Sequence, residues 1–337
     1  MPPDSVTRKP GREHRLIRTR AALMLAIVAV GSAISLGATG MDESVLTELV
    51  RLEKETGLAI AFYENELGVV SFKKRAFYEM GMVVPTGGLD GTVSPDGAEV
   101  AVDSLNWGAG YRDQTIFVDI IGTDGSGLRE YREINGALPC WSHNESKVAM
   151  ALRKPREGRL GILDLDSKKM RTFDTETAEE FSRFTSQCWA PDDKELVFEG
   201  DGKVQVYEIE KDHTRILATG TKPTWSPDGN WIAFRDGNYF YAIHPSGEGK
   251  KKLFHKTRAY SGLFWSPDGR FVAYVHEDFL ALDVEFYHLM VRRLKDNSET
   301  WVADGVGCCI DLQWVRNPEL LKRAEAAAKA RRTKGPA

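Results

Sequence analysis

The sequence predicts an all-β fold, a six-bladed β-propeller, because a short phrase recurs at a blade-like spacing with strand-like segments between its copies. Successive copies begin 48, 48, 36, 40 and 49 residues apart. A period of roughly 40–50 residues with several short strands in each is the signature of propeller blades. The phrase is Val93-Ser-Pro-Asp-Gly97, and its later copies begin at Trp141, Trp189, Trp225, Trp265 and, in degraded form, Trp314.

One repeat shows how the local sequence specifies a blade. The chain leading to Trp225 predicts an inner strand, and segments 231–234, 239–243 and 251–254 predict three more strands. Ser-Pro-Asp-Gly forms the turn after the inner strand because Pro presets φ, Asp bonds its own backbone and Gly accepts a positive φ. We therefore interpret the repeat aspartates as turn-forming rather than catalytic: Asp96, Asp192, Asp228 and Asp268.

The two ends of the propeller are expected to share one blade. The copy at Trp314 lacks its own later strands, whereas segments 58–63, 68–72 and 74–80 predict later strands without an inner one. A composite closing blade satisfies both ends and hides strand edges that would otherwise be exposed. We also expect a short amphipathic helix over 41–56, the propeller over 57–316, and a basic helical or flexible tail over 317–337, which we expect to be solvated.

The N-terminal residues 1–40 predict export. A basic stretch ending at Arg20 precedes Ala21–Ala38, which carries no charge, and Ala38-Thr-Gly40 offers a signal-peptidase site. Two alternatives stay open: a cleaved signal peptide, or an uncleaved anchor, since 18 uncharged residues is near the lower limit for spanning. In both cases the propeller is expected to be periplasmic or otherwise extracytoplasmic, with an inner-membrane tether through residues 21–38 in the second case.

Composition describes an ordinary soluble globule, with 42% hydrophobic and 28% charged residues. The net charge is −4, and residues 1–40 carry six Lys or Arg and two acids, which leaves −8 for the remainder. An acidic body of this kind argues against nucleic-acid binding, which needs a dense basic surface.

The four cysteines predict neither a metal site nor a redox motif, because no Cys-x-x-Cys spacing is present. Cys140 and Cys188 each precede a repeat Trp and so occupy equivalent positions on neighbouring blades. Because inner strands of adjacent blades diverge, we expect buried free thiols there. Cys308 and Cys309 are expected to be adjacent unpaired thiols. No cofactor is predicted. The histidines, including His276 and His288 near strands of the fifth blade, are not spaced to share a metal locally, although a site in the axial channel stays open.

The phrase Trp-Ser-Pro-Asp-Gly followed by an apolar-Ala-apolar strand resembles the WD-like repeats of the TolB propeller. It is also similar to the propeller halves of prolyl-oligopeptidase and dipeptidyl-peptidase-type enzymes. The resemblance covers roughly residues 57–316 and implies a six-bladed ring. Only about 16 residues separate the signal from the first strand, so the α/β domain of TolB proteins is not expected. Asp124-Gly-Ser126-Gly127 lacks the first Gly of a Gly-x-Ser-x-Gly nucleophile elbow.

Strand direction predicts which face binds a partner. In a four-stranded blade with strands a to d, the b–c and d–a connections lie on one face, and the long connections 103–114, 153–159, 175–183 and 255–260 all fall there. Aromatic and Arg side chains are typical interface anchors. The candidate binding residues are Trp107, Tyr111, Arg112, Arg153, Arg156, Arg159, Phe181, Arg183, Arg258 and Tyr260.

The leading interpretation is an exported, non-enzymatic propeller that binds a protein or peptide across this loop face. The alternative is a small-substrate enzyme, a lyase or hydrolase, acting in the axial channel with or without a metal, as oligogalacturonate lyases with similar repeats do. A carbohydrate-binding surface is a third interpretation, which depends only on Trp107 and Tyr111.

Overall fold

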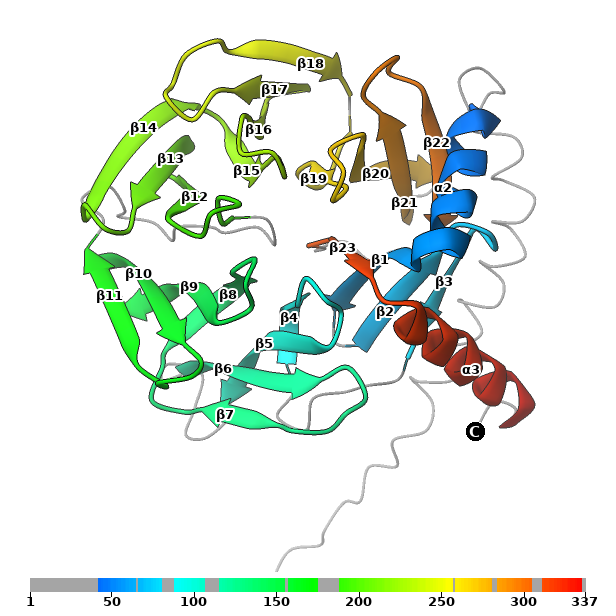
Figure 1. Ribbon diagram of the computed structural model, residues 1–337, viewed down its shortest axis with the longest axis horizontal. Helices are drawn as coiled ribbons and strands as arrows, with labels where there is room; N and C mark the ends of the chain where they lie inside the picture. Colours follow the sequence, from blue (N-terminus) through cyan, green and yellow to red (C-terminus); the bar gives the residue numbers. More distant parts are fainter. Residues whose placement is uncertain are drawn as a thin grey trace, which may run out of the picture. The chain divides into compact units, whose positions relative to one another are not determined.

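The computed structural model describes residues 42–64, 66–80, 88–106, 115–154, 157–174, 188–256, 258–280, 284–304 and 311–334. Within these ranges the chain is built mostly from antiparallel sheets, with two helices. The sheets surround a central axis in the arrangement of a β-propeller (Figure 1). The all-β expectation is therefore confirmed.

The strands follow one another around the axis in sequence order. The first are β1 (Leu58–Glu64), β2 (Glu66–Ser71), β3 (Ala76–Glu79), β4 (Gly88–Val93), β5 (Glu99–Asn106), β6 (Thr115–Gly122), β7 (Arg129–Tyr131), β8 (Gly136–Trp141), β9 (Lys147–Lys154), β10 (Glu157–Asp164) and β11 (Met170–Asp174). The later ones are β12 (Glu195–Gly200), β13 (Lys203–Glu208), β14 (His213–Thr219), β15 (Thr221–Trp225), β16 (Ile232–Asp236), β17 (Tyr239–Ile243), β18 (Lys251–His255), β19 (Phe264–Trp265), β20 (Phe271–Leu280), β21 (Val284–Arg293), β22 (Glu299–Asp304) and β23 (Gln313–Arg316).

The four repeats that begin at Trp141, Trp189, Trp225 and Trp265 each form a separate antiparallel sheet, in the order that the sequence pattern predicts. The sheets β8–β11, β15–β18 and β19–β22 have four strands, and β12–β14 has three. In that three-stranded sheet Trp189 supplies the inner position through an isolated bridge to Leu196. In these four sheets the inner segment therefore ends at a repeat Trp, as the phrase requires.

The two ends of the described propeller meet in one sheet. β23 pairs antiparallel with β1, with Trp314 opposite Ile60. β1 also touches β4, with Tyr63 opposite Gly91, so that β1–β7 and β23 form a single eight-stranded sheet. Segments more than 240 residues apart in sequence thus share main-chain hydrogen bonds.

The second strand of each repeat is buried on both faces, as its continuous apolar sequence predicts. Val100, Ala101 and Val102 in β5 are fully buried, and so are Val272 and Ala273 in β20. Successive residues of a strand point to opposite faces, so both faces of these strands must be covered. The apolar clusters accordingly lie between neighbouring sheets.

The turns confirm the structural role of the repeat aspartates. Ser94 donates its hydroxyl to Asp96 Oδ1 at 2.6 Å, and the Ala98 amide donates to the same oxygen at 2.8 Å. Gly97 follows with a φ of 71°, which glycine adopts at little cost. The same Ser–Asp bond recurs in the turns at Asp228 and Asp268.

Two repeats carry an acid where the phrase has Gly, and each acid stabilises the turn of the preceding repeat. Glu145 and Asp193 have positive φ values of 59° and 57°. Glu145 Oε1 accepts from the Asp96 amide at 2.8 Å. The Asp193 carboxylate accepts from the His143 amide at 2.8 Å and the Asn144 amide at 3.1 Å. Burial acts to raise the pKa of Asp193, but the hydrogen bonds from His143 and Asn144 outweigh it and hold that pKa below its usual range.

The repeat tryptophans also join neighbouring sheets. Three indoles donate their Nε1–H to the main chain of the preceding repeat at 3.0 Å: Trp141 to Thr92 O, Trp189 to Cys140 O and Trp314 to Phe264 O. A hydrogen bond to a buried carbonyl adds direction to apolar burial. The Trp of the phrase is therefore a contact between sheets as well as a core residue.

One cysteine prediction is wrong. Cys140 and Cys188, expected as free thiols, form a disulfide whose Cα atoms are 6.4 Å apart. The prediction assumed that inner strands of adjacent sheets diverge too far. At these two positions the chains lie close enough for a bridge, which tolerates Cα separations up to about 7 Å. Cys308 and Cys309 lie outside the described residues.

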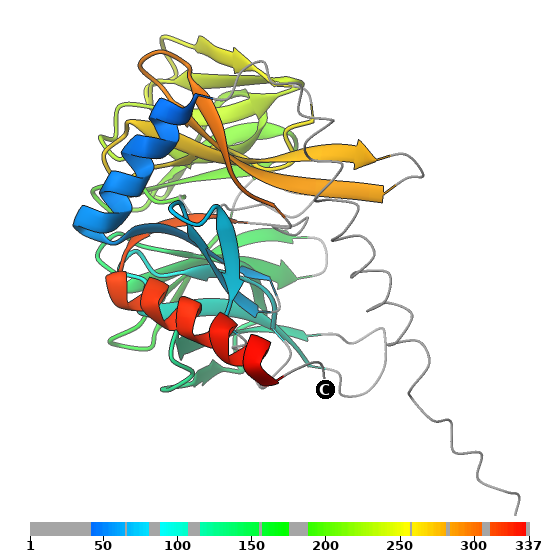
Figure 2. The same cartoon turned by 90° about the vertical axis from the view of Figure 1, so that its right-hand side faces the viewer.

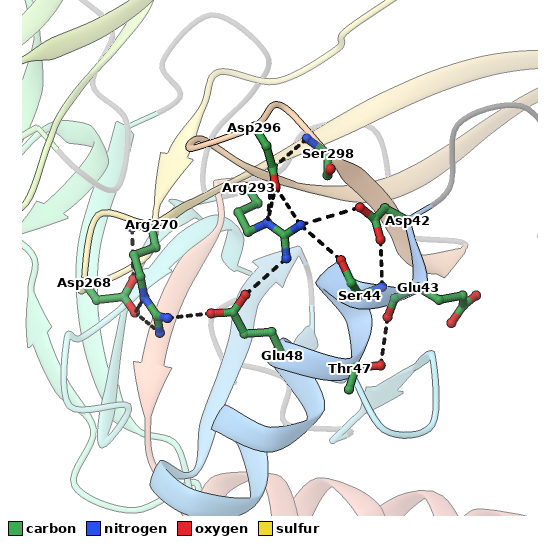
Figure 3. A network of polar contacts seen from close by, with 10 residues as sticks. All are labelled: Asp42, Glu43, Ser44, Thr47, Glu48, Asp268, Arg270, Arg293, Asp296 and Ser298. Atoms are coloured by element: carbon green, nitrogen blue, oxygen red, sulfur yellow. Dashed lines mark hydrogen bonds and ion pairs between the residues drawn. The ribbon is translucent and has the colours of Figure 1, made fainter.

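The expected N-terminal helix is present as α2 (Glu43–Thr56). Asp42 caps it by accepting from the Ser44 amide, and Gly57 ends it with a φ of 69°. Val45 and Leu49 are buried against the core. Figure 3 shows the contacts of Arg293 at the start of this helix. Its guanidinium donates to Ser44 of the helix at 3.0 Å and lies 3.4 Å from Glu48, and it also donates to Asp296 at 2.8 Å.

The C-terminal tail differs from the expected solvated helix. Residues Pro318–Lys334 form α3, which packs along β2 and β3 (Figure 1). Leu320 and Ala324 are fully buried. Arg331 pairs with Glu66 at 2.8 Å and with Glu79 at 2.9 Å. The alternating apolar and basic residues thus serve attachment to the sheet as well as solvation.

Neither α2 nor α3, the helices of the described ranges, is long and apolar enough to cross a membrane. Residues 21–38, the predicted signal or anchor, lie outside the described ranges.

Candidate functional site

The predicted loop face is described only in part. Arg258 is exposed and Tyr260 is half-buried in the connection between β18 and β19. Arg153 lies in β9 and Arg159 in β10, where Arg159 is opposite Leu152. The other candidates lie outside the described residues: Trp107, Tyr111, Arg112, Arg156, Phe181 and Arg183.

The connection that carries Arg258 and Tyr260 is attached to the neighbouring sheet. The Tyr260 amide donates to Val275 O at 2.8 Å, and the Glu277 amide donates to Arg258 O at 2.9 Å. Together with the isolated β-bridge between Ala259 and His276, these bonds attach the connection to the edge of β20. A loop bound to a strand in this way presents its side chains in a defined direction, as a binding surface requires.

Cations and aromatic rings converge around Tyr260. Its ring lies edge-on to Tyr287 with centroids 5.2 Å apart. The Lys222 ammonium lies 5.1 Å from the Tyr260 ring centroid and donates to the Tyr260 carbonyl. Arg235 donates to the carbonyl of Ala259, and burial lowers the pKa of its guanidinium while Glu277 partly offsets that effect. We call Lys222, Arg235, Arg258, Tyr260 and Tyr287 the Tyr260 cluster.

The hairpins on this face differ in length. β20 and β21 have ten residues each, whereas β16 and β17 have five. Figure 2 shows the β20–β21 hairpin extending beyond the neighbouring described sheets. The Tyr260 cluster therefore lies beside a projecting hairpin, to which Tyr287 belongs and to which Tyr260 is hydrogen-bonded.

The same hairpin brings two histidines together. His276 and His288 are opposite each other, with nearly parallel rings 6.5 Å apart. Asp304 bonds His288 Nδ1 and accepts from Trp301 Nε1 at 2.7 Å. Sequence spacing did not reveal this pairing because it depends on strand register. Among the described side chains, no group of three or more His, Cys, Asp or Glu is arranged to hold a metal ion.

A concavity lies on the opposite face, where the turns between inner and second strands meet the axis. It is a pocket of about 420 Å³, within the size range of small-ligand sites. Its polar lining includes His143, Gln313 and Arg316. The apolar lining comes from the repeat phrase: Pro95, Pro191, Pro227, Pro267, Trp141, Trp189, Trp225, Trp265 and Trp314. Sequence reasoning assigned these residues to turns and core, although the recurrence of their phrase was the signal for a ring around the axis.

Comparisons with known proteins bear on the fold. No protein-family model and no curated protein matches this sequence. Among solved structures, a putative TolB from Agrobacterium tumefaciens aligns with a TM-score of 0.58 and 14% identity over 76% of this chain and 98% of that chain. TolB from Acinetobacter baumannii aligns with a TM-score of 0.56 and 14% identity over 77% of this chain and 66% of that chain.

A chain of a nidogen/laminin complex also aligns, with a TM-score of 0.55 and 10% identity over 74% of this chain and 97% of that chain. At these identities the likeness establishes the fold. The protein is thus a TolB-like β-propeller in architecture, as the repeat phrase predicted, and function must be argued from its own surface.

Proposed function

We propose that this protein is an exported, non-enzymatic β-propeller scaffold that binds a protein or peptide across the face carrying the Tyr260 cluster. The observation that carries the proposal is the connection 258–260 beside the projecting β20–β21 hairpin. Lys222 lies over Tyr260, which contacts Tyr287, Arg235 donates to the Ala259 carbonyl, and Arg258 is exposed. Arg and Tyr anchor protein interfaces more often than other residues do. One of the structurally similar propellers comes from a nidogen/laminin complex, which is consistent with a partner of this kind.

We further propose that the ring has six blades and that the last is composite. Six inner segments support this count, namely β4, β8, the Trp189 bridge, β15, β19 and β23. The pairing of β23 with β1 supports the composite blade. Closure by both chain ends would hold the loop face rigid, because opening the ring would break main-chain bonds.

Export is supported by two independent features. The uncharged segment 21–38 behind a basic stretch has the pattern of a signal or anchor. The Cys140–Cys188 disulfide is of a kind that persists in oxidising compartments and is rare in a reducing cytosol. We therefore propose a periplasmic or other extracytoplasmic location, with a membrane tether if residues 21–38 are retained.

Charge-reversal and truncation variants of the loop face test the binding proposal. Arg258→Glu and Tyr260→Ala are each expected to reduce partner recovery from an extracytoplasmic extract more than tenfold, as loss of an interface anchor does. Arg316→Glu places the same reversal on the opposite face and is expected to recover partners like the parent. Trp107→Ala and Arg156→Ala extend the test to the rest of the predicted face. Equal recovery by all variants would refute this choice of face.

A small-substrate enzyme acting at the axis is the second candidate function. The pocket of about 420 Å³ at the axial opening favours a small ligand by its size and apolar lining. His143 and Arg316 are its hydrogen-bond-donating basic side chains, and either could bind an anionic substrate. Conversion of a small substrate by the purified parent and its loss in His143→Ala would favour this candidate over the scaffold.

A further inference from the structure

The outer edge of the β15–β18 sheet carries three lysines over three half-buried aromatic rings. Strand register puts Lys251 and Trp231 on one face of this sheet, and Lys252, Tyr239 and Tyr241 on the other. The Lys251 ammonium lies 3.4 Å from the Trp231 ring centroid, and the Lys252 ammonium lies 3.7 Å from that of Tyr239. Lys250 lies 4.4 Å from the ring centroid of Tyr241. We call these six residues the lysine–aromatic patch. All three lysines are exposed, and β18 is the outermost strand of its sheet.

Strand register shows that Lys251 is equivalent to an ion-paired basic residue in each of two other sheets. Arg129 in β7 lies beside Ile120, Arg215 in β14 beside Val206, and Lys251 in β18 beside Ala242. Each of these three partners is in turn paired with a residue of the next strand inward, namely Ala101, Val197 and Ala233. Each of those residues lies eight positions after the start of its own repeat phrase. The three basic residues are therefore structurally equivalent.

Their partners differ in charge. Arg129 pairs with Glu99 at 2.7 Å, and Arg215 pairs with Glu195 at 2.9 Å. Both glutamates stand six positions after the start of their phrase, where the β15–β18 repeat has Trp231. Replacing a carboxylate by an indole keeps a favourable site for the cation but leaves its charge uncompensated. The Arg–Glu pairs of the two other sheets are neutral, whereas the Lys251–Trp231 pair of the β15–β18 sheet carries a positive charge.

The surrounding sequence increases this excess of positive charge. Residues 249–267 contain five Lys or Arg and no acid, in a chain whose body carries −8 outside residues 1–40. Lys250 has a carboxylate neighbour, Asp236, at 3.5 Å, and Glu248 precedes it in the turn. Within the described residues, Lys251 and Lys252 form no ion pair. The patch is therefore a cationic sheet edge, with lysines on both faces of the sheet, on an otherwise acidic protein.

We propose that the lysine–aromatic patch binds the anionic headgroups of a phospholipid membrane. Lys, Trp and Tyr together are the residues enriched where proteins contact the headgroup region, because each combines an apolar body with a polar tip. Exposed cation–π contacts are weak, so the ammonium groups can exchange rings for lipid phosphates. Lysines on an edge strand oppose the addition of a further strand, which disfavours an acidic peptide as the partner. Contact with a membrane would orient the propeller and leave the Tyr260 cluster as a separate site.

Vesicle binding by full-length protein tests the proposal. The parent is compared with Lys250→Gln/Lys251→Gln/Lys252→Gln on neutral phosphatidylcholine vesicles and on vesicles that also contain phosphatidylglycerol. Lys194→Gln/Lys203→Gln/Lys211→Gln removes three exposed lysines of the β12–β14 sheet as a matched control. All three proteins keep residues 1–41, so any membrane affinity of that segment is common to them.

The parent and the control are expected to bind the anionic vesicles roughly 100-fold more tightly than the patch variant, from three lysines near an anionic surface. The difference should vanish in 1 M salt, where charges are screened within about 3 Å. Hydrogen exchange of residues 251–255 should slow when anionic vesicles are added to the parent. Unchanged affinity of the patch variant with no change in exchange would overturn the proposal. So would patch-dependent binding of an oligoglutamate peptide without binding of vesicles, which would assign the surface to an acidic protein.

Discussion

Removing the Cys140–Cys188 disulfide should destabilise the propeller by an amount that its loop length determines. The bridge closes a loop with a sequence separation of 48 residues. In the chain-entropy description such a cross-link restricts the unfolded state and contributes about 4 kcal/mol at 25 °C. For a folded unit of about 300 residues, this corresponds to a melting-temperature change of roughly 6 °C. Cys140 and Cys188 are themselves fully buried, and the other contacts between the sheets are expected to keep the propeller folded without the bridge.

The assay is thermal and guanidinium unfolding of oxidised parent protein, of the reduced parent, and of Cys140→Ala/Cys188→Ala. The reduced parent and the double variant should be destabilised alike, and reductant should have no further effect on the variant. Cys308→Ala/Cys309→Ala is the control for a contribution from the other two cysteines and should retain the full response to reductant.

A peptide map of the unreduced protein provides the independent check. It should contain a linked pair of peptides that includes Cys140 and Cys188. Free thiols at both positions in protein isolated from an oxidising compartment, or equal stability before and after reduction, would refute the reasoning. Such a result would restore the sequence-based expectation of buried free thiols.

Three further predictions concern the contacts that join the sheets and helices. Asp193→Ala removes the acceptor of the His143 and Asn144 amides and should cost about 2 kcal/mol in urea unfolding. Asp193→Gly should cost about 1 kcal/mol less, because Gly tolerates the positive φ; equal losses would argue against the backbone contribution. Leu320→Ala removes a fully buried side chain of α3 and should cost about 2–5 kcal/mol, whereas an unchanged unfolding midpoint would show that α3 is not attached. The hydrogen bond from Arg293 lowers the pKa of Asp296 to about 2. The stabilisation of the folded protein by this bond should therefore be complete above the unfolded-state pKa of 3.8 and be lost as the pH falls toward 2. The melting temperature of Asp296→Asn should therefore fall less than that of the parent between pH 4 and pH 2, and parallel profiles would contradict this assignment.

The repeat phrase predicted the secondary structure well because its information is local. Ser, Pro, Asp and Gly at adjacent positions determine a turn through their own backbone preferences and hydrogen bonds. Ser94, Asp96 and Gly97 do this within one turn. The apolar run that follows predicted a strand buried on both faces, and Val100–Val102 is such a strand.

The candidate site was less predictable because its residues come from different repeats. Tyr260 was chosen from a long connection, and the structure adds Lys222, Arg235 and Tyr287 to it. Each of these three lies in another strand or turn and has no local motif. The six candidates outside the described residues, among them Trp107 and Arg156, stay predictions.

The sequence by itself determined that this chain is a ring of repeated antiparallel sheets, because turn chemistry and strand periodicity operate over fewer than ten neighbouring residues. Only the tertiary structure decided which distant side chains meet: Cys140 with Cys188 and Asp193 with the turn at His143 between sheets, and Lys251 with Trp231 within one sheet. The first two contacts join residues about 50 positions apart, and all three depend on how strands pair and pack. No residue type or spacing specifies that geometry in advance.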